Sequence, residues 1–145
     1  NKIKQGDPYQ WQVEQSVKEL VKKLDIKNLN YILSYQSRVG PLKWIGPSTE
    51  NIIKEEARKQ KIIVVVPVAF VSEHSETLVE LDIEYRKLAE ENGSRDYIRV
   101  PAVAVNRDFV NSLKSSILQA SRGEKFTSSV RCLEKFKKCP RFQIL

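Results

Sequence analysis

The single histidine of this chain, His74, is followed by glutamates at regular intervals. Glu76, Glu80 and Glu84 recur every fourth residue, which would place their carboxylates along one side of a helix. Imidazole nitrogens and carboxylates can accept protons, and a row of carboxylates can relay protons or hold a hydrated cation. Like charges at this spacing repel by about 0.2–0.5 kcal/mol per pair, so the row has a cost. The pattern indicates proton or cation traffic at His74, or else a structural histidine beside a solvated face of glutamates.

An apolar run before these residues and a helical pattern after them must position the side chains. Residues 61–66, KIIVVV, have a β-branched side chain at every position after the lysine, which is typical of a strand buried on both faces of a parallel sheet. Apolar residues spaced three and four apart predict a helix from Ser75 to about Asn92. In open α/β sheets, ligands bind where strands lead into helices, so His74 and Glu76 are expected at a ligand-binding edge.

Helical and strand patterns alternate along the whole chain. The predicted order is helix, strand, helix, strand, helix, strand, helix, which is typical of an α/β fold with an open parallel sheet and helices on both faces. The other expected helices span residues 8–24, 49–60 and 108–121, with Asp7, Ser48 or Thr49, and Asp108 as N-caps, and the other expected strands span residues 31–35 and 97–100. We expect one domain over residues 1–121 and an irregular basic tail over residues 122–145.

Composition and charge restrict the function classes. The 145 residues suffice for one domain, and 41% hydrophobic with 30% charged residues is typical of a globular protein. No apolar run approaches the roughly 20 residues of a membrane span and no signal segment is recognisable, which fits a cytoplasmic protein or a clipped chain.

The net charge of +7 is concentrated near the carboxyl end. Residues 107–145 hold nine Lys or Arg against three Asp or Glu, which leaves +6 there. Such a tail leaves open a peripheral contact with an anionic membrane surface. A nucleic-acid partner is not expected, because no recognised nucleic-acid motif accompanies the charge. We favour a solvated surface.

The loop of residues 36–47 holds a tryptophan, Trp44, between two Gly-Pro pairs that mark turns. Its side chain either packs back onto the core or forms an aromatic plate for a flat ligand. The expected place of the loop, at the same sheet edge as His74, makes the second alternative more attractive. The chain has no GxGxxG, P-loop, nucleophile elbow or CxxC motif, so the usual nucleotide-binding and hydrolase functions of α/β domains lack support.

Several separate segments together resemble one family. The stretch VPVAFVSEHSETLVELDIEY at residues 66–85, the segment GDPYQWQV at residues 6–13 and the loop YQSRVGPLKWIGPST at residues 35–49 are similar, in this order, to marker segments of ferrochelatases. Ferrochelatases insert ferrous iron into a porphyrin late in haem synthesis. The resemblance covers about residues 5–118 and is specific, because several separated motifs match.

The resemblance implies a fold and a role for each candidate residue. It implies two similar α/β domains with the porphyrin between them, of which this chain would be the carboxyl-terminal one. Glu76 matches the metal-site glutamate of the family, and His74 matches its second histidine, to which proton removal or metal passage is ascribed. Glu80 and Glu84 match an acidic row along a helix that widens to a π-type turn. The residues implied to lie at the porphyrin pocket are Trp44, Ser37 and Arg38.

This chain departs from the family pattern in three respects. The principal catalytic histidine of the family precedes the GDPY segment, in a strand that this chain does not include, and the amino-terminal domain is absent as well. An isolated chain is therefore expected to be inactive. Glu73 stands where aspartate is commoner in the family, which conserves the charge and adds reach. Some members bind a [2Fe-2S] cluster through four cysteines, but Cys132 and Cys139 cannot supply that set, so we expect free thiols, no cluster and no resident cofactor.

Two functions from different classes follow. The first is the carboxyl-terminal half of a ferrochelatase, a lyase of the bacterial cytoplasm that acts on ferrous iron and protoporphyrin or coproporphyrin, with the missing amino-terminal domain as its partner. The second is a non-catalytic α/β binding module whose basic tail, residues 122–145, docks on anionic lipid or nucleic acid. Quenching of tryptophan fluorescence by porphyrin would favour the first, and salt-sensitive retention on anionic surfaces would favour the second.

Overall fold

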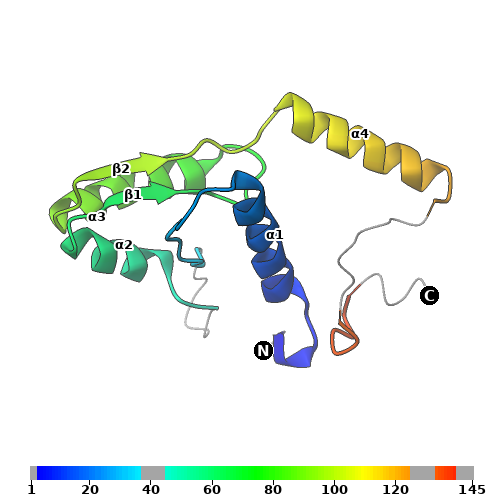
Figure 1. Cartoon of the computed structure of the whole chain (residues 1–145), viewed down its shortest axis with the longest axis horizontal. Coiled ribbons are helices and arrows are strands. Elements are labelled where there is room, and N and C mark those ends of the chain that lie inside the picture. Colours follow the sequence, from blue (N-terminus) through cyan, green and yellow to red (C-terminus); the bar gives the residue numbers. More distant parts are fainter. Residues whose placement is uncertain (1–2, 37–44, 125–132, 140–145) are drawn as a thin grey trace. The chain divides into compact units, whose positions relative to one another are not determined.

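The computed structural model of the chain describes residues 3–36, 45–124 and 133–139. The elements in chain order are a 3-10 helix Ile3–Gln5, α1 Tyr9–Leu24, α2 Thr49–Arg58, β1 Ile62–Val65, a π-helix Glu76–Glu84, α3 Tyr85–Glu91, β2 Asp96–Arg99 and α4 Arg107–Ser121 (Figure 1). The contacts divide the chain into two units, Val13–Ala102 and Asn1–Gln12 with Val103–Leu145. The expected porphyrin-pocket residues Ser37, Arg38 and Trp44 lie outside the described residues, as does Cys132.

The sheet of the first unit consists of two parallel strands. β1 and β2 pair from Ile62 opposite Asp96 to Val65 opposite Arg99. Parallel strands need a crossover connection, and the π-helix and α3 together supply it. The predicted α/β class with an open parallel sheet is confirmed.

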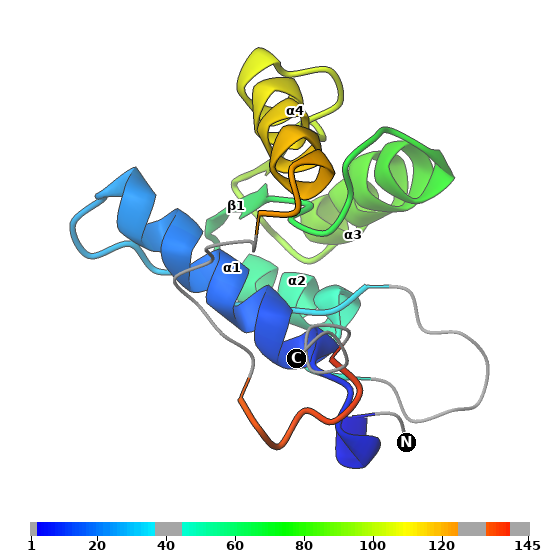
Figure 2. The same ribbon diagram turned by 90° about the vertical axis from the view of Figure 1, so that its right-hand side faces the viewer.

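One face of this sheet carries the core of the unit. Ile53 of α2, Ala89 of α3 and Tyr97 of β2 are each no more than 2% exposed and pack together. The partly buried residues around them are Ile63, Val65, Tyr85 and Leu88. Both α2 and α3 therefore cover this one face of the strands, and Figures 1 and 2 show them beside β1.

Two strand predictions need correction. The run 61–66 does not form a strand buried on both faces, because Ile62 and Val64 point away from the covered face and are 59% and 55% exposed. β-Branched residues favour either kind of strand, so their run cannot separate the two. The predicted strand 31–35 is also wrong, since Tyr35 forms only an isolated bridge with Ser48.

Helix termini mostly follow their sequence signals. Asp7 Oδ1 accepts a hydrogen bond from the Tyr9 N–H at 2.9 Å, and Ser48 Oγ caps α2. Gly93, with φ of 88°, follows the end of α3 in the left-handed conformation that glycine tolerates. The predicted cap of α4 is wrong, because Asn106 rather than Asp108 accepts from the first-turn N–H groups. Asparagine caps a helix as well as aspartate does, and Asn106 stands two residues before Asp108.

The second unit contains α4 and the described part of the predicted basic tail. No residue of α4 is buried. Residues 133–139 are in contact with the start of the chain: the rings of Trp11 and Phe136 lie 5.4 Å apart, and the Lys138 N–H donates to the Gly6 carbonyl at 3.3 Å. Cys139 is buried, with 1% of its surface exposed.

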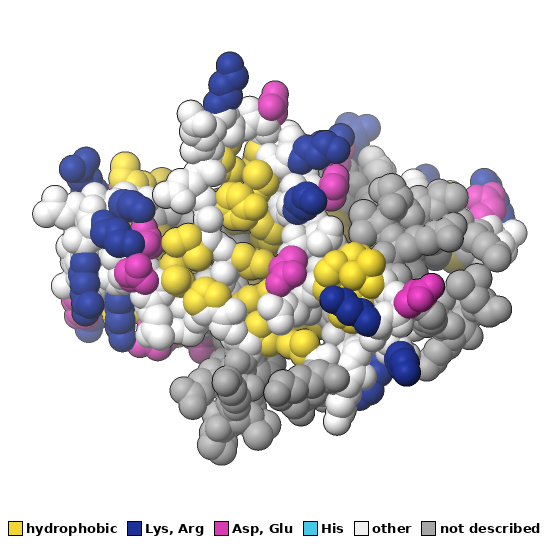
Figure 3. Space-filling model, turned by 60° about the horizontal axis from the view of Figure 1, so that its bottom comes forward, with side chains coloured by type: hydrophobic (Ala, Val, Ile, Leu, Met, Phe, Trp, Pro, Cys, Tyr) yellow, Lys and Arg dark blue, Asp and Glu magenta, His cyan; other side chains and the backbone are white. Residues whose placement is uncertain are grey.

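The described surface carries many apolar side chains between its charged ones, as one face shows in Figure 3. Within the described ranges, no helix is both long enough and apolar enough to cross a membrane.

Candidate active site

The three glutamates of the acidic row, Glu76, Glu80 and Glu84, all belong to the π-helix. Its hydrogen bonds run from residue i to i+5, so it winds more loosely than an α-helix and brings residues four apart closer to a single line. Thr77 and Leu81, which are 0% and 2% exposed, hold another side of the helix against the protein. π-Helical turns are rare in proteins, but those that occur often lie at functional sites. The structure thus shows the widening that the resemblance implied.

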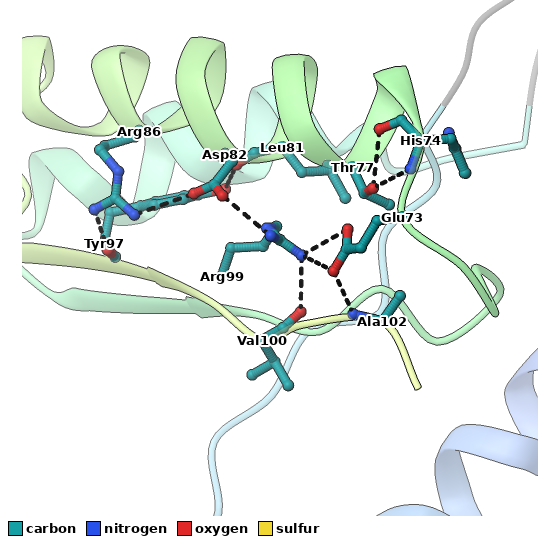
Figure 4. A network of polar contacts seen from close by, with 10 residues as sticks. All are labelled: Glu73, His74, Thr77, Leu81, Asp82, Arg86, Tyr97, Arg99, Val100 and Ala102. Carbon is teal, nitrogen blue, oxygen red and sulfur yellow. Dashed lines mark hydrogen bonds and ion pairs between the residues drawn. The ribbon is translucent and has the colours of Figure 1, made fainter. Parts of the chain in front are cut away.

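His74 lies two residues before the π-helix and is bound to its first turn. The Glu76 N–H donates to His74 Nδ1 at 3.2 Å. Thr77 Oγ1 accepts from the His74 N–H at 2.9 Å and donates to the His74 carbonyl at 3.0 Å (Figure 4). The Phe70 ring packs edge-on against the imidazole, with centroids 4.8 Å apart. Since Nδ1 accepts a hydrogen bond, the neutral imidazole carries its proton on Nε2.

Gln36 connects the middle of the acidic row to α3. Its Nε2 donates to Glu80 Oε2, and its Oε1 accepts from the Tyr85 hydroxyl at 2.7 Å. Burial raises the pKa of Tyr85, the bond to Gln36 lowers it, and the charges of Glu80, Glu50 and Glu84 raise it again. Tyr85 is therefore a neutral hydrogen-bond donor around neutral pH.

An open hollow lies beside the last two glutamates of the row. Its lining residues are Glu50, Glu80, Glu84, Tyr85 and Leu88. In the parts of the chain that the structure describes, no Lys or Arg forms an ion pair with Glu80 or Glu84. Negative charge around a hollow attracts cations. No group of three His, Cys, Asp or Glu side chains among the described residues is arranged to hold a metal ion by itself.

A second set of carboxylates near the site is bound by arginine. Arg99 Nη1 lies 2.8 Å from Glu73 Oε1, and the Ala102 N–H donates to the same oxygen at 2.9 Å. Hydrogen bonds from Thr77, Arg99 and the Ala102 backbone lower the pKa of Glu73 to about 2. Glu73 is therefore ionised throughout the neutral range, next to His74 in sequence.

Asp82, on the π-helix, is the other member of this set. Arg99 Nη2 lies 3.0 Å from Asp82 Oδ2, and Arg86 Nη2 lies 3.2 Å from Asp82 Oδ1. The bond from Arg99 lowers the pKa of Asp82 more than that from Arg86. Arg86 also donates to the Tyr97 carbonyl at 2.7 Å, and the Tyr97 hydroxyl donates to the Leu81 carbonyl at 2.5 Å.

The structure brings together four of the predicted site residues on one segment and adds others. The loop and π-helix that carry His74, Glu76, Glu80 and Glu84 are continuous. Sequence reasoning missed Gln36, Glu50 and Arg99. For Arg99 a signal existed, because a charged residue in a short strand before a proline needs a partner if it is buried. Gln36 and Glu50 carried no such signal.

Comparison with known proteins gives a consistent result. The sequence model of the family described as Ferrochelatase matches residues 1–121. A curated protein of Pelagibacter ubique named ferrochelatase is 59% identical over 143 residues, which are 95% of this chain and 41% of that protein. Ferrochelatases of Rickettsia felis and Rickettsia bellii are 50% and 45% identical, with 81% and 94% of this chain and 34% and 40% of those proteins aligned.

The chain thus spans about 40% of the length of the curated relatives that it matches. The family model covers most of the chain, including the loop before the π-helix and the whole acidic row. On this evidence the chain belongs to the ferrochelatase family.

Proposed function

We propose that this chain supplies one wall of the site at which a ferrochelatase inserts ferrous iron into a porphyrin. The observation that carries the proposal is the π-helix, which aligns Glu76, Glu80 and Glu84 directly after His74. Its support from known proteins is the family match over residues 1–121.

The chemistry requires proton acceptors next to the metal. Binding of one Fe²⁺ by a porphyrin releases the two protons of its pyrrole nitrogens, and the metal must lose its water ligands. His74 and Glu76 are the two acceptors that we assign to these protons, with Glu76 and His74 also contacting the metal as it passes. Protonation of His74 at Nδ1 would break the hydrogen bond from the Glu76 N–H. Proton uptake by the imidazole is therefore coupled to the start of the π-helix.

Glu80 and Glu84 extend this path along the hollow. Carboxylates without a cationic partner can stabilise an incoming dication or accept protons released at the site. The hydrogen bond from Gln36 holds the Glu80 carboxylate in place without neutralising its charge. We assign to Glu80 and Glu84 the transfer of protons or hydrated iron between solvent and Glu76.

The porphyrin itself would contact residues outside the described ranges. The family resemblance assigns Trp44 to the wall of the porphyrin pocket, with Ser37 and Arg38 near it. A tryptophan can stack on a planar macrocycle, and an arginine can pair with a carboxylate substituent. Whether the porphyrin is protoporphyrin or coproporphyrin depends on such contacts at its rim.

The remaining assignments concern the whole protein. A second wall, which includes the principal catalytic histidine of the family, would come from another part of the protein, so the isolated chain would be inactive. Residues 1–121 would form the chelatase domain and residues 122–145 a tail, in the bacterial cytoplasm with a peripheral membrane contact. The proposal includes no resident cofactor, and iron enters as the substrate.

The direct test is iron insertion by the full-length protein that contains this chain. Glu76→Gln should lower the rate on the order of 10²-fold or more, because it removes a proton acceptor at the reacting centre. Glu90→Gln, on the exposed side of α3, is the matched control and should stay within twofold of the parent rate. A Glu76→Gln variant that turns over at the parent rate would refute the assignment of Glu76.

The binding-module alternative makes a different prediction. Removal of residues 122–145 would abolish retention on anionic vesicles or nucleic acid, and porphyrin would not quench tryptophan fluorescence. Quenching that disappears in Trp44→Ala, with Trp11 still present, would support the ferrochelatase function instead.

A further inference from the structure

Arg99 occupies the end of β2 and reaches two carboxylates that lie nine residues apart in the sequence. Its side chain is 8% exposed. Nη1 contacts both oxygens of Glu73, at 2.8 and 3.1 Å, and Nη2 contacts Asp82 at 3.0 Å. Figure 4 shows the guanidinium between the two acids. Its Nε is buried with no hydrogen-bond partner among the described residues, so the two acids, together with a longer bond from Nη1 to the Val100 carbonyl at 3.5 Å, stabilise this buried cation.

In the sequence, Glu73 precedes and Asp82 follows the first two glutamates of the acidic row, Glu76 and Glu80. Glu73 directly precedes His74, and the Ala102 N–H also binds it, which fixes this loop to the chain just after β2. Asp82 lies in the last third of the π-helix. The segment between them contains His74, Glu76 and Glu80. The Arg99 side chain, which comes from β2, therefore binds both ends of the segment to which we assign proton uptake and metal contact.

This arrangement depends on the π-helical hydrogen-bond pattern. A change from i to i+5 bonding to i to i+4 bonding would rotate each later residue about the helix axis. Asp82 would then move away from Glu73, and one guanidinium could no longer contact both. The two ion pairs thus favour the looser winding, which is otherwise the rarer state of a helix.

We propose that Arg99 is a positioning residue for metal insertion, which holds the π-helix in register by binding Glu73 and Asp82. It touches neither metal nor porphyrin, and acts through the placement of His74 and Glu76. The link of Arg99 to iron insertion rests on the function proposed above. Its effect on the π-helix does not.

The test uses the full-length protein with Arg99→Lys, Arg99→Ala and the control Arg86→Met. Lysine keeps the charge but lacks the planar fork that binds two carboxylates, so Arg99→Lys should lower kcat on the order of 10- to 100-fold, as expected for groups misplaced by about 1 Å. KM for the porphyrin should change less than twofold. Added methylguanidine should restore part of the activity of Arg99→Ala. Arg86 also binds Asp82 but does not contact Glu73, so Arg86→Met should stay within about twofold.

Hydrogen exchange gives a readout that is independent of activity. Backbone amides of Glu76–Glu84 should exchange faster in Arg99→Lys than in the parent protein, with little change in Arg86→Met. If the parent protein inserts no iron, the proposed function fails, and the exchange rates still decide whether Arg99 holds the π-helix.

Two results would overturn the proposal. One is a kcat within twofold of the parent for both Arg99 variants. The other is that Arg86→Met lowers kcat and speeds hydrogen exchange as much as the Arg99 variants do. The effects would then reflect a general loss of stability and not the contacts of Arg99. If Arg99→Ala does not fold, Glu73→Gln weakens the same ion pair at its more exposed end and should show the same fall in kcat. An unchanged kcat in Glu73→Gln would also count against it.

Discussion

Two sets of carboxylates on one stretch of chain differ in their partners. Glu73 and Asp82 are bound by arginines, and both have pKa values below the usual range. Glu80 has an amide donor, Gln36, and neither Glu80 nor Glu84 has an ion pair among the described residues. A carboxylate that only supports the fold gains from a cationic partner. Glu80 and Glu84 have no such partner among the described residues and repel each other, which indicates that their charge is used elsewhere.

The largest expected change in the free energy of unfolding comes from the buried side of the π-helix. Leu81 is 2% exposed on the π-helix, between the acidic row and Asp82. Leu81→Ala should lower the free energy of unfolding by about 2–5 kcal/mol, because it removes buried surface and leaves a cavity. Urea denaturation followed by circular dichroism measures this. Glu90→Ala, an exposed site on α3, should change the same quantity by no more than about 0.5 kcal/mol.

Loss of one arginine-bound acid should have a smaller effect on stability. Asp82→Asn should cost about 1–2 kcal/mol, since a charge-assisted bond to Arg99 is lost at a site that is one-third exposed. The pKa of Asp82 is lowered in the fold, so its contribution is present above its ordinary pKa of 3.8 and is lost as the pH falls below that value. The parent protein should therefore lose more stability than Asp82→Asn between neutral and acidic pH. Parallel curves would contradict this.

The Tyr97 hydroxyl binds the π-helix through the Leu81 carbonyl, and its removal should have the next smaller effect on stability. Burial raises the pKa of Tyr97 to about 12. Because the folded pKa is the higher one, the contribution is complete below the ordinary pKa of 10.0 and is lost as the pH rises toward 12. Tyr97→Phe should cost about 0.5–1.5 kcal/mol at neutral pH through the bond to the Leu81 carbonyl. It should also remove the latest component of the phenolate absorbance titration, and a titration that keeps this component would refute the assignment.

The smallest expected change is a gain in stability, from a substitution in the acidic row. Glu84 lies at the exposed end of the acidic row, four residues after Glu80. Glu84→Gln should raise the free energy of unfolding by about 0.2–0.5 kcal/mol, because it removes like-charge repulsion. The same urea measurement checks it. A loss of stability as large as that of Asp82→Asn would erase the distinction between the two sets.

The sequence predicted the elements that local chemistry determines. Asp7, Ser48 and Gly93 act at their helix ends as expected, and the parallel pairing of β1 with β2 follows from a strand, a helix and a strand in succession. Burial of a strand on one face or two depends on which helices cover it, and the run at 61–66 does not encode that choice. The segment 31–35 has strand-forming residues but lacks a neighbour along most of its length.

The candidate site was predictable for one set of carboxylates only. Spacing of four residues, together with the family resemblance, identified Glu76, Glu80 and Glu84. The contact between Glu73 and Arg99 joins residues 26 apart in sequence, and it follows from the register of β2 against the loop before the π-helix. Such a contact depends on tertiary structure, and periodicity in one chain cannot reveal it.

The most direct test of the difference between the two sets of carboxylates compares Glu80→Gln with Asp82→Asn in the full-length protein. We predict that Glu80→Gln lowers the rate of iron insertion at least tenfold while the free energy of unfolding stays within about 0.5 kcal/mol of the parent. Asp82→Asn should lose stability as well as rate, because it removes one of the two bonds by which Arg99 holds the π-helix. A Glu80→Gln variant that keeps the parent rate, or one that loses as much stability as Asp82→Asn, would contradict the account.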